Sequence, residues 1–321
     1  MQFSIPKLLA ACALAASFAV PVLAQSWPTQ PIKIIVPFPP GGTTDRIIRL
    51  VQPHLQQRLG QTIVVENRGG ASGSLGTLAA AKSPPDGNTF LLVFDTHGVN
   101  PSLIPNLPYD TLNDLTPVML IGTSPMVVTT HPNSPYKSFK DVMNAQGGPP
   151  AYGTIGGGSL AHLAMVQIAK EGNVAMTHVP YKGGGPLVND AIAGHVPLAI
   201  ASVALLMPNI QAGQIRAIAV TSAERFKLLP EVPTIAEQGL TNFDAEAWWG
   251  LLAPAKTPVA ILDKMNEAFA DALRQPSVKI PLEQAGLTIR ATDGPAFGRF
   301  LSQQVVRWGK VVKDNKITPG Q

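Results

Sequence analysis

Residues 32–45 read IKIIVPFPPGGTTD, an apolar run that ends in two glycines and two threonines. A short apolar run rich in Ile and Val is typical of a buried strand, and residues 45–59 that follow have the apolar spacing of an amphipathic helix. Glycine lets a backbone approach a ligand closely, and a helix N-terminus offers free N–H groups and a positive dipole end. The segment therefore predicts a strand, a turn that faces a ligand, and a helix.

Three more apolar runs end in the same way. The runs at 62–66, 151–154 and 177–179 lead into glycine-rich turns at 69–74, 156–159 and 183–185, and a helix-like stretch follows each turn. Glycine and serine also end strands and cap helices where no ligand binds, which is the alternative for any single turn. Four such turns at matching places favour a pocket for a small anion.

The order of elements predicts an α/β fold. Strands are expected at 32–36, 61–66 and 89–94, alternating with helices at 45–59 and 75–82, and the alternation restarts at 126–130 and runs to 216–222. Such alternation predicts mostly parallel sheets with right-handed crossovers. Two units in series indicate two lobes, and ligands of such sheets bind beyond the carboxyl ends of the strands, where the glycine turns lie. Further helices are expected at 259–274 and 293–316.

The N-terminus has the pattern of a secretory signal peptide. Lys7 precedes an apolar run at 8–23, and Val22-Leu23-Ala24 is a small-x-small cleavage site, so residues 1–24 are expected to be removed. Cys12 stands in an alternative lipoprotein cleavage box, but few apolar residues precede it. With cleavage after Ala24 the remaining chain has no cysteine, which excludes disulfides and thiol chemistry.

Composition and motifs argue against several functions. The net charge is +4 and the basic residues are scattered, so nucleic-acid binding is unsupported. The chain carries no G-x-S-x-G nucleophile turn, no Walker loop and no complete G-x-G-x-x-G motif. The histidines lack the spacing of a metal site. We therefore expect no enzyme activity, no cofactor and no metal.

Four titratable residues stand near the predicted turns. His162 follows the 156–159 turn and is a candidate neighbour of a bound carboxylate, whereas a structural role is the alternative for His97 and His162. Asp95 and Asp190 are candidate acids, and helix capping or a surface position is the alternative for Asp190. On the expected strand at 245–252, Trp248 and Trp249 face opposite ways, so that one of them is available to the cleft.

Several motifs together resemble the receptors of the tripartite tricarboxylate transporters, the Bug family. They are IVPFPPGGTTD at 35–45, VENRGGASG at 65–73, LPYD at 107–110 and HVPYKGG at 178–184. The resemblance extends in order over the whole chain after the signal peptide. Gly69 stands where proline is usual, and the 95–98 loop is more polar than the typical small-residue version. A specific ligand is therefore not transferred.

The resemblance implies a two-lobed, type II periplasmic-binding-protein-like fold that closes on a small organic carboxylate. Residues 25–124 with 246–321 would form one lobe and residues 125–245 the other. The implied protein is a periplasmic monomer without chemistry on its ligand, which it hands to a membrane permease of one large and one small subunit. Di- or tricarboxylates, aromatic carboxylates and acidic amino acids are the candidate ligands. A receptor that docks on a sensor kinase and a secreted hydrolase are the alternatives.

The expected ligand-binding residues come mainly from this resemblance. The first loop would contribute Phe38, Pro40, Gly41, Gly42 and Thr43, with one carboxylate held partly through ordered waters. The next two loops would contribute Ala71, Ser72, Asp95 and Thr96. The other lobe would contribute Thr154, Gly158, Ser159, His162, Asp190 and Ser202.

Overall fold

The computed structural model describes residues 27–240 and 243–318. The expected signal peptide, residues 1–24, and Cys12 within it lie outside the described residues. Among the helices that the structure describes, none is both long and apolar enough to cross a bilayer.

The first three strands of the chain form one end of the sheet. β1 (Ile32–Val36) lies between β2 (Ile63–Asn67) and β3 (Thr89–Phe94) and runs parallel to both. The segments that connect or follow these strands carry α2 (Thr43–Leu59), the short 3-10 helix η1 (Ala71–Gly73), α3 (Ser74–Ala81) and α4 (Thr96–Leu103).

A second set of parallel strands forms the other end of the sheet. β5 (Ala151–Thr154) lies between β6 (Thr177–Pro180) and β7 (Leu198–Ser202). This part also contains α5 (Phe139–Met143), α6 (Leu160–Glu171), α7 (Gly184–Ala193), α8 (Val203–Gln211), β8 (Arg216–Val220) and η2 (Ala236–Gln238).

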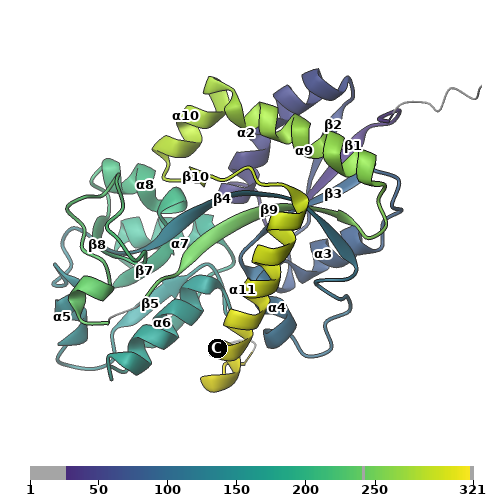
Figure 1. The fold of residues 1–321 in the computed structure, drawn as a ribbon. Coiled ribbons are helices and arrows are strands. Elements are labelled where there is room, and N and C mark those ends of the chain that lie inside the picture. Colours follow the sequence, from purple (N-terminus) through teal and green to yellow (C-terminus); the bar gives the residue numbers. More distant parts are fainter. Residues whose placement is uncertain (1–26, 241–242, 319–321) are drawn as a thin grey trace, which may run out of the picture.

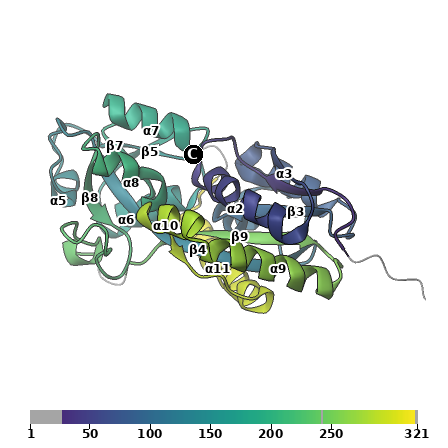
Figure 2. The same ribbon diagram turned by 90° about the horizontal axis from the view of Figure 1, so that it is seen from above.

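Two antiparallel strands join these parts. β4 (Leu115–Thr130) pairs with β9 (Glu246–Pro254) as far as Pro125, and from Met126 onward the same strand pairs with β7 and β8. The main path of the sheet is β2-β1-β3-β9-β4-β7-β5-β6. We call the β2, β1, β3 and β9 side the first lobe and the β7, β5, β6 and β8 side the second lobe. Figures 1 and 2 show β4 and β9 running between them.

The C-terminal segment packs along both lobes. It contains α9 (Val259–Arg274), α10 (Pro276–Gln284), β10 (Thr288–Ile289) and α11 (Gly294–Asp314). α9 packs on α2, while α11 contacts α4 and β4 of the first lobe and α6 of the second. Asp293 caps α11 by accepting a hydrogen bond from the Ala296 N–H at 2.7 Å.

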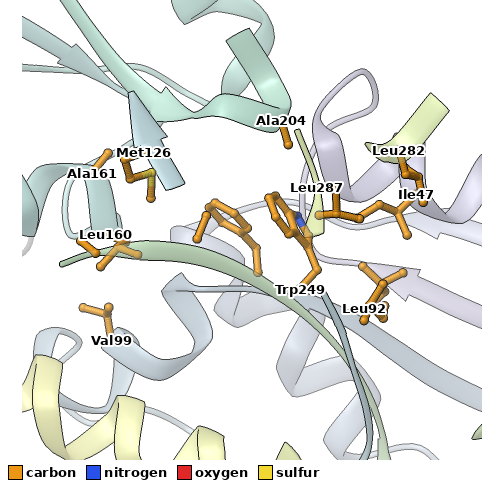
Figure 3. Packing of buried hydrophobic residues seen from close by; sticks show 14 of the residues in the cluster. Ile47, Leu92, Val99, Met126, Leu160, Ala161, Ala204, Trp249, Leu282 and Leu287 are labelled. Atoms are coloured by element: carbon orange, nitrogen blue, oxygen red, sulfur yellow. The ribbon is translucent and has the colours of Figure 1, made fainter. Parts of the chain in front are cut away.

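One apolar cluster continues from lobe to lobe (Figure 3). It joins Ile47 and Leu92 of the first lobe with Met126, at the crossing, and Leu160 of the second. The side chains of Trp248 and Trp249 belong to different clusters, because successive residues of a strand face opposite sides of the sheet. Trp248 packs on Phe297 and Phe300 of α11, whereas Trp249 packs on Phe94.

The two-lobed α/β fold predicted from the sequence is confirmed. The sheet is mixed, because the parallel strands of each lobe flank an antiparallel centre. The expected strand at 126–130 is only the end of β4, which begins at Leu115. α4, α8 and α10 were not expected: each contains a proline, at 101, 208 and 281 respectively, a residue that usually argues against a helix interior.

Candidate functional site

A cleft of about 700 Å³, open to solvent, lies between the two lobes. Its first-lobe wall contains the loop between β1 and α2, and its second-lobe wall contains the loop between β6 and α7. The two loops approach closely, since a Cβ built on Gly183 would lie 4.0 Å from Pro39 Cδ. A concave site between two lobes with an apolar lining and a few polar groups suits a small organic molecule.

The N-terminus of α2 opens into the cleft. Gly42, Thr43, Thr44 and Asp45 line it, and the N-cap Gly42 offers no side-chain acceptor to the first turn. The Asp45 carboxylate accepts hydrogen bonds from the Gly41 N–H at 3.2 Å and from Asn67 Nδ2 at 3.1 Å. These bonds fix the loop at the start of the helix. The free N–H groups of the first turn, and with them the positive end of the helix dipole, therefore face the cleft.

The N-terminus of α7 opens into the cleft from the other lobe. Gly183, Gly184 and Gly185 line it, and again no side chain caps the helix. Lys182 lines the same wall and has no ion-pair partner among the described residues. Both a helix dipole and an ammonium group therefore favour an anion at this wall.

Two largely buried residues in the cleft lining carry hydroxyl groups without a protein partner. Ser202 is 3% exposed and Thr44 is 5% exposed, and both line the cleft. Neither side chain makes a hydrogen bond to any residue that the structure describes. These two side chains are thus available to a polar ligand.

The rest of the cleft is mainly apolar. Phe38 meets Phe94 edge-on with ring centroids 6.0 Å apart, and Phe94 lies 5.2 Å from Trp249. These rings form an aromatic wall, and non-aromatic apolar side chains line the cleft beside it, namely Met126, Ile155, Ala161, Ala201 and Leu205. Such a lining suits the hydrocarbon part of a ligand whose polar ends reach the helix termini.

A smaller cavity adjoins the cleft behind Phe38 and Phe94, which line both. Its polar side chains are those of Ser72, Thr77, Thr96, His97 and Asn100. His97 is buried and stacks on Tyr109, and burial lowers the pKa of its ring to about 3. The imidazole is therefore neutral at physiological pH.

The 156–159 turn lies against the first lobe rather than in the cleft lining. A Cβ on Gly158 would overlap the Leu103 side chain of α4. Ser72 Oγ lies 3.5 Å from the carbonyl oxygen of Gly157. The buried carboxyl group of Asp95 lies near the Leu160 N–H, and burial raises its pKa. These contacts hold the two lobes together at the cleft floor.

Hydrogen bonds shape the first turn of α6. Ser159 Oγ accepts from the His162 N–H at 3.3 Å, and His162 Nδ1 accepts from the Gly158 N–H at 3.0 Å. The His162 ring stacks on His178 at 3.9 Å, and burial together with His178 lowers the pKa of His162 to about 3. Thr154 Oγ1 lies 2.8 Å from His178 Nε2. These hydrogen bonds and the stacked rings hold the turn in place.

Asp190 stands apart from the cleft lining. Its carboxylate accepts a hydrogen bond from Tyr181 Oη at 2.8 Å and lies 3.4 Å from His195 Nδ1. The Tyr181 hydrogen bond is the main cause that lowers the pKa of Asp190. Both carboxylate oxygens therefore have protein partners.

The structure thus sorts the residues expected from the sequence into three groups. Those that line the cleft are Phe38, Pro40, Gly42, Thr43 and Ser202, and those that line the smaller cavity are Phe38, Ser72 and Thr96. Those that line neither are Gly41, Ala71, Asp95, Thr154, Gly158, Ser159, His162 and Asp190.

Several cleft residues were missed as individual site residues. The sequence did point to the 183–185 turn, but Lys182 was noted only as part of a motif. Met126 was noted only as part of an expected strand, and the sequence left open which of Trp248 and Trp249 faces the cleft, because burial under a ligand and burial under protein select the same apolar types. The alternation at 248–249 was the one available signal for Trp249.

Comparison with known proteins places the chain in a family. The family model described as "Tripartite tricarboxylate transporter family receptor" matches residues 47–317. Protein BugT of Bordetella pertussis is 37% identical over 305 residues, which cover 93% of each protein. The structure of R. palustris Rpa4515 with adipate is 34% identical, with a TM-score of 0.86, and the match covers 91% of this chain and 99% of that chain.

A second solved structure, MatC (Rpa3494) from Rhodopseudomonas palustris with bound malate, is 30% identical, with a TM-score of 0.83. It covers 89% of this chain and 100% of that chain. The expected resemblance is confirmed over most of the chain. Like these relatives, the protein belongs to the tripartite tricarboxylate transporter receptor family of periplasmic solute-binding proteins.

Proposed function

We propose that the protein is a periplasmic receptor for a small organic dicarboxylate with an apolar middle. The observation that carries the proposal is the pair of uncapped helix N-termini, of α2 and α7, on opposite walls of one apolar cleft. Each terminus suits one carboxylate. The aromatic wall between them suits a hydrocarbon spacer, and it offers few hydrogen bonds to a ligand that is polar throughout.

The charge balance of the cleft supports a ligand that is bound and released. Lys182 is an exposed cation at the second-lobe wall, while Asp45 at the first-lobe wall is held by its own hydrogen bonds. Most of the remaining donors are neutral N–H and O–H groups. Neutral donors bind a carboxylate without a buried ion pair, and ordered waters add contacts at a cost of about 0–2 kcal/mol each.

Relatives support the ligand class. Two of the similar structures are those of Rpa4515 with adipate and of MatC with bound malate, and both ligands are dicarboxylates. Adipate has a four-carbon apolar middle, which fits the aromatic wall of this cleft better than the short, hydroxylated malate does. We therefore rank an adipate-like or aromatic dicarboxylate above a small hydroxy acid.

The ligand would contact residues from both lobes. We assign the ligand carboxylates to polar groups of both lobes, namely Gly42, Thr43, Thr44, Lys182, Gly183–Gly185 and Ser202. The hydrocarbon spacer would contact Phe38, Phe94 and Trp249. Pro40 and Gly41 shape the loop. Ser72 and Thr96 would contact a ligand that extends behind Phe38, whereas Ala71, Thr154, Ser159, His162 and Asp190 would act through the scaffold.

We also propose lobe boundaries at 124/125 and 245/246. The exchange of partners along β4 supports them, since Pro125 pairs with Glu246 of β9 and Met126 pairs with Ser202 of β7. Residues 25–124 with 246–321 would then move against residues 125–245 when a ligand binds. Closure would be driven by contacts made only when both walls meet the ligand.

The family supports the remaining parts of the proposal. The receptor would act as a monomer after signal-peptide removal at Ala24. It would deliver its ligand to a permease of one large and one small membrane subunit, without chemical change to the ligand.

Isothermal titration of the purified protein with adipate, terephthalate, malate and the monocarboxylate hexanoate tests the proposal. We expect binding of adipate or terephthalate, weaker binding of malate, and little binding of hexanoate, which leaves one helix terminus unpaired. Equal affinity for hexanoate and adipate would contradict a site with two anion positions.

A further inference from the structure

Asp45 brings a carboxylate of the protein into a cleft that is proposed to bind the carboxylates of a ligand. It is the third residue of α2, lines the cleft and is 8% exposed. A carboxylate at this position of a helix typically reaches back to the N–H group of the capping residue and so closes the helix terminus. Asp45 is therefore placed to compete with a ligand for the free N–H groups of the first turn.

The protein contains the typical arrangement in α5. There Asp141 is the third helical residue, and its carboxylate accepts a hydrogen bond from the N–H group of the capping residue Ser138 at 2.8 Å. In α2 the Asp45 carboxylate accepts from the N–H group of Gly41, one residue before the capping residue, at 3.2 Å. The N–H group of the capping residue itself, Gly42, has no acceptor among the described residues. Something must therefore hold the Asp45 carboxylate away from that N–H group.

Asn67 and Arg49 hold the other oxygen of the Asp45 carboxylate. Asn67 Nδ2, at the end of β2, donates to Asp45 Oδ1 at 3.1 Å, and Arg49 Nε lies 3.4 Å from the same oxygen. Arg49 Nη2 also donates to Asn67 Oδ1 at 3.2 Å, so the three side chains form a closed ring of polar contacts. Neither Asn67 nor Arg49 lines the cleft. The carboxylate is thus held by groups from outside the cleft lining.

Asn67 also anchors the loop that precedes the helix. Its Nδ2 donates to the carbonyl oxygen of Phe38 at 3.1 Å, and Phe38 lines the cleft. Asn67 is paired with Val36 of β1, which places its amide group beside the start of this loop. One side chain therefore connects the Asp45 carboxylate and the aromatic wall to the sheet.

We propose that Asn67, assisted by Arg49, is a positioning residue that keeps the Asp45 carboxylate off the first turn of α2. The N–H groups of this turn thereby stay free for a ligand carboxylate, and the Arg49 guanidinium group offsets the negative charge of Asp45 at the wall. This inference rests on the proposed function. Without Asn67, the Asp45 carboxylate would accept from the Gly42 N–H, which lowers the fraction of the protein that is ready to bind a ligand.

Titration calorimetry of Asn67→Ala with adipate tests the inference. We expect the dissociation constant to rise about threefold to thirtyfold, the range of a helix-capping interaction. Adding Asp45→Asn, which keeps an oxygen for the Gly41 N–H but removes the competing charge, should restore most of the lost affinity. A loop that was merely loosened by the loss of Asn67 would not be repaired by this second change. Arg49→Gln replaces Asn67→Ala if the alanine protein does not fold, since Arg49 is half-exposed.

Asn266→Ala is the matched control. Asn266 Nδ2 also donates to two acceptors, the backbone carbonyl oxygens of Val118 and Thr292 at 2.7 and 2.9 Å, and Asn266 lies outside the cleft lining. Its loss should lower the free energy of unfolding and leave the affinity for adipate unchanged. If Asn266→Ala weakens adipate binding as much as Asn67→Ala does, the effect is a general loss of stability, and the inference is overturned.

A crystal structure of the ligand-free Asn67→Ala protein gives a readout that needs no ligand. We expect a carboxylate oxygen of Asp45 within hydrogen-bond distance of the Gly42 N–H, as Asp141 lies to Ser138 in α5. An Asp45 carboxylate that still leaves this N–H group free overturns the inference, and so does an unchanged adipate affinity in the folded variant. If the wild-type protein binds neither adipate nor terephthalate, the proposed function fails, and the crystal structure alone decides whether Asn67 positions Asp45.

Discussion

Gly158 of the second lobe lies directly against Leu103 of the first, leaving no room for a side chain at position 158. Gly158 also has a φ of +74°, which L-residues rarely adopt. The sequence suggested that this glycine lets a ligand approach the backbone. The structure gives it a different neighbour, since the space beside it is filled by Leu103.

Gly158→Ala should therefore destabilise the contact between the lobes. We expect a loss of about 2–4 kcal/mol in the free energy of unfolding, from overpacking and from backbone strain together. Urea unfolding measures it. Gly213→Ala is the matched control, because Gly213 has a φ of +68° with open space around it, so that only the strain remains. Gly158→Ala combined with Leu103→Ala should recover the overpacking part, and failure to recover any stability would contradict the steric explanation.

Gly42→Val should leave the fold intact and abolish ligand binding. Gly42 has an extended backbone at φ −82°, ψ 172°, and a Cβ there meets nothing within 4 Å. A branched side chain would extend into the cleft at the carboxylate position. We expect the free energy of unfolding to change by less than about 1 kcal/mol and the dissociation constant for adipate to rise at least tenfold. Wild-type affinity in this variant would show that the N-terminus of α2 is not part of the ligand site.

Ser202→Ala should weaken binding while sparing stability. The Ser202 hydroxyl group has no protein partner among the described residues, so its loss removes a hydrogen bond only when ligand is bound. We expect a twofold to tenfold rise in the dissociation constant, equivalent to about 0.5–1.5 kcal/mol.

Ser124→Ala is the control for this substitution and should behave in the opposite way. Ser124 Oγ accepts a hydrogen bond from the Ala204 N–H at 3.1 Å and is fully buried. Its removal should lower the free energy of unfolding by about 1–3 kcal/mol. If both variants lost the same stability and the same affinity, Ser202 would have no separate role in the ligand site.

Lys182→Gln should reduce both affinity and its dependence on salt. The Lys182 ammonium group lines the cleft and has no ion-pair partner among the described residues. An exposed cation attracts an anionic ligand through water, and added salt screens this attraction. We expect wild-type affinity to fall between 20 mM and 500 mM sodium chloride, about twofold to fivefold more steeply than that of the variant. Lys227→Gln, on an exposed loop, should keep the wild-type salt dependence.

The Asp95 carboxyl group should make stability depend on pH. Burial raises its pKa in the folded protein above the unfolded value of about 3.9, so the folded state binds the proton more tightly. Relative to Asp95→Asn, the wild-type protein should therefore lose stability as the pH rises above about 4, until the folded pKa is passed. Urea unfolding of both proteins between pH 4 and pH 8 measures the difference, and a constant difference over that range would show that Asp95 titrates normally.

Local sequence patterns predicted the parallel strands and glycine turns well, because strand burial and helix capping are decided within a few residues. The pattern of residues 32–45 predicted β1, the loop after it and the start of α2, with boundaries within two residues of those observed. Strand alternation alone predicted that the side chains of Trp248 and Trp249 lie on opposite faces of the sheet. Two α/β units in series predicted the two lobes, whereas the resemblance supplied their boundaries, which stay a prediction.

Contacts between distant segments were beyond these patterns. Nothing near residue 158 indicates that Leu103 fills the space beside it. The prolines at 117 and 125 conceal the length of β4, because proline in a strand interior is uncommon. Each of these features depends on a partner more than 50 residues away or on pairing that a local window does not contain.

β4 has a consequence for how the molecule unfolds. One strand supplies backbone hydrogen bonds to β9 in the first lobe and to β7 and β8 in the second. If β4 detaches from the strands of one lobe, the strands of the other lobe also lose their hydrogen-bonding partner. Neither half of the protein therefore has an independent melting transition. The protein should unfold in a single calorimetric step despite its two lobes, and a backbone nick within residues 115–130 should inactivate both halves at once.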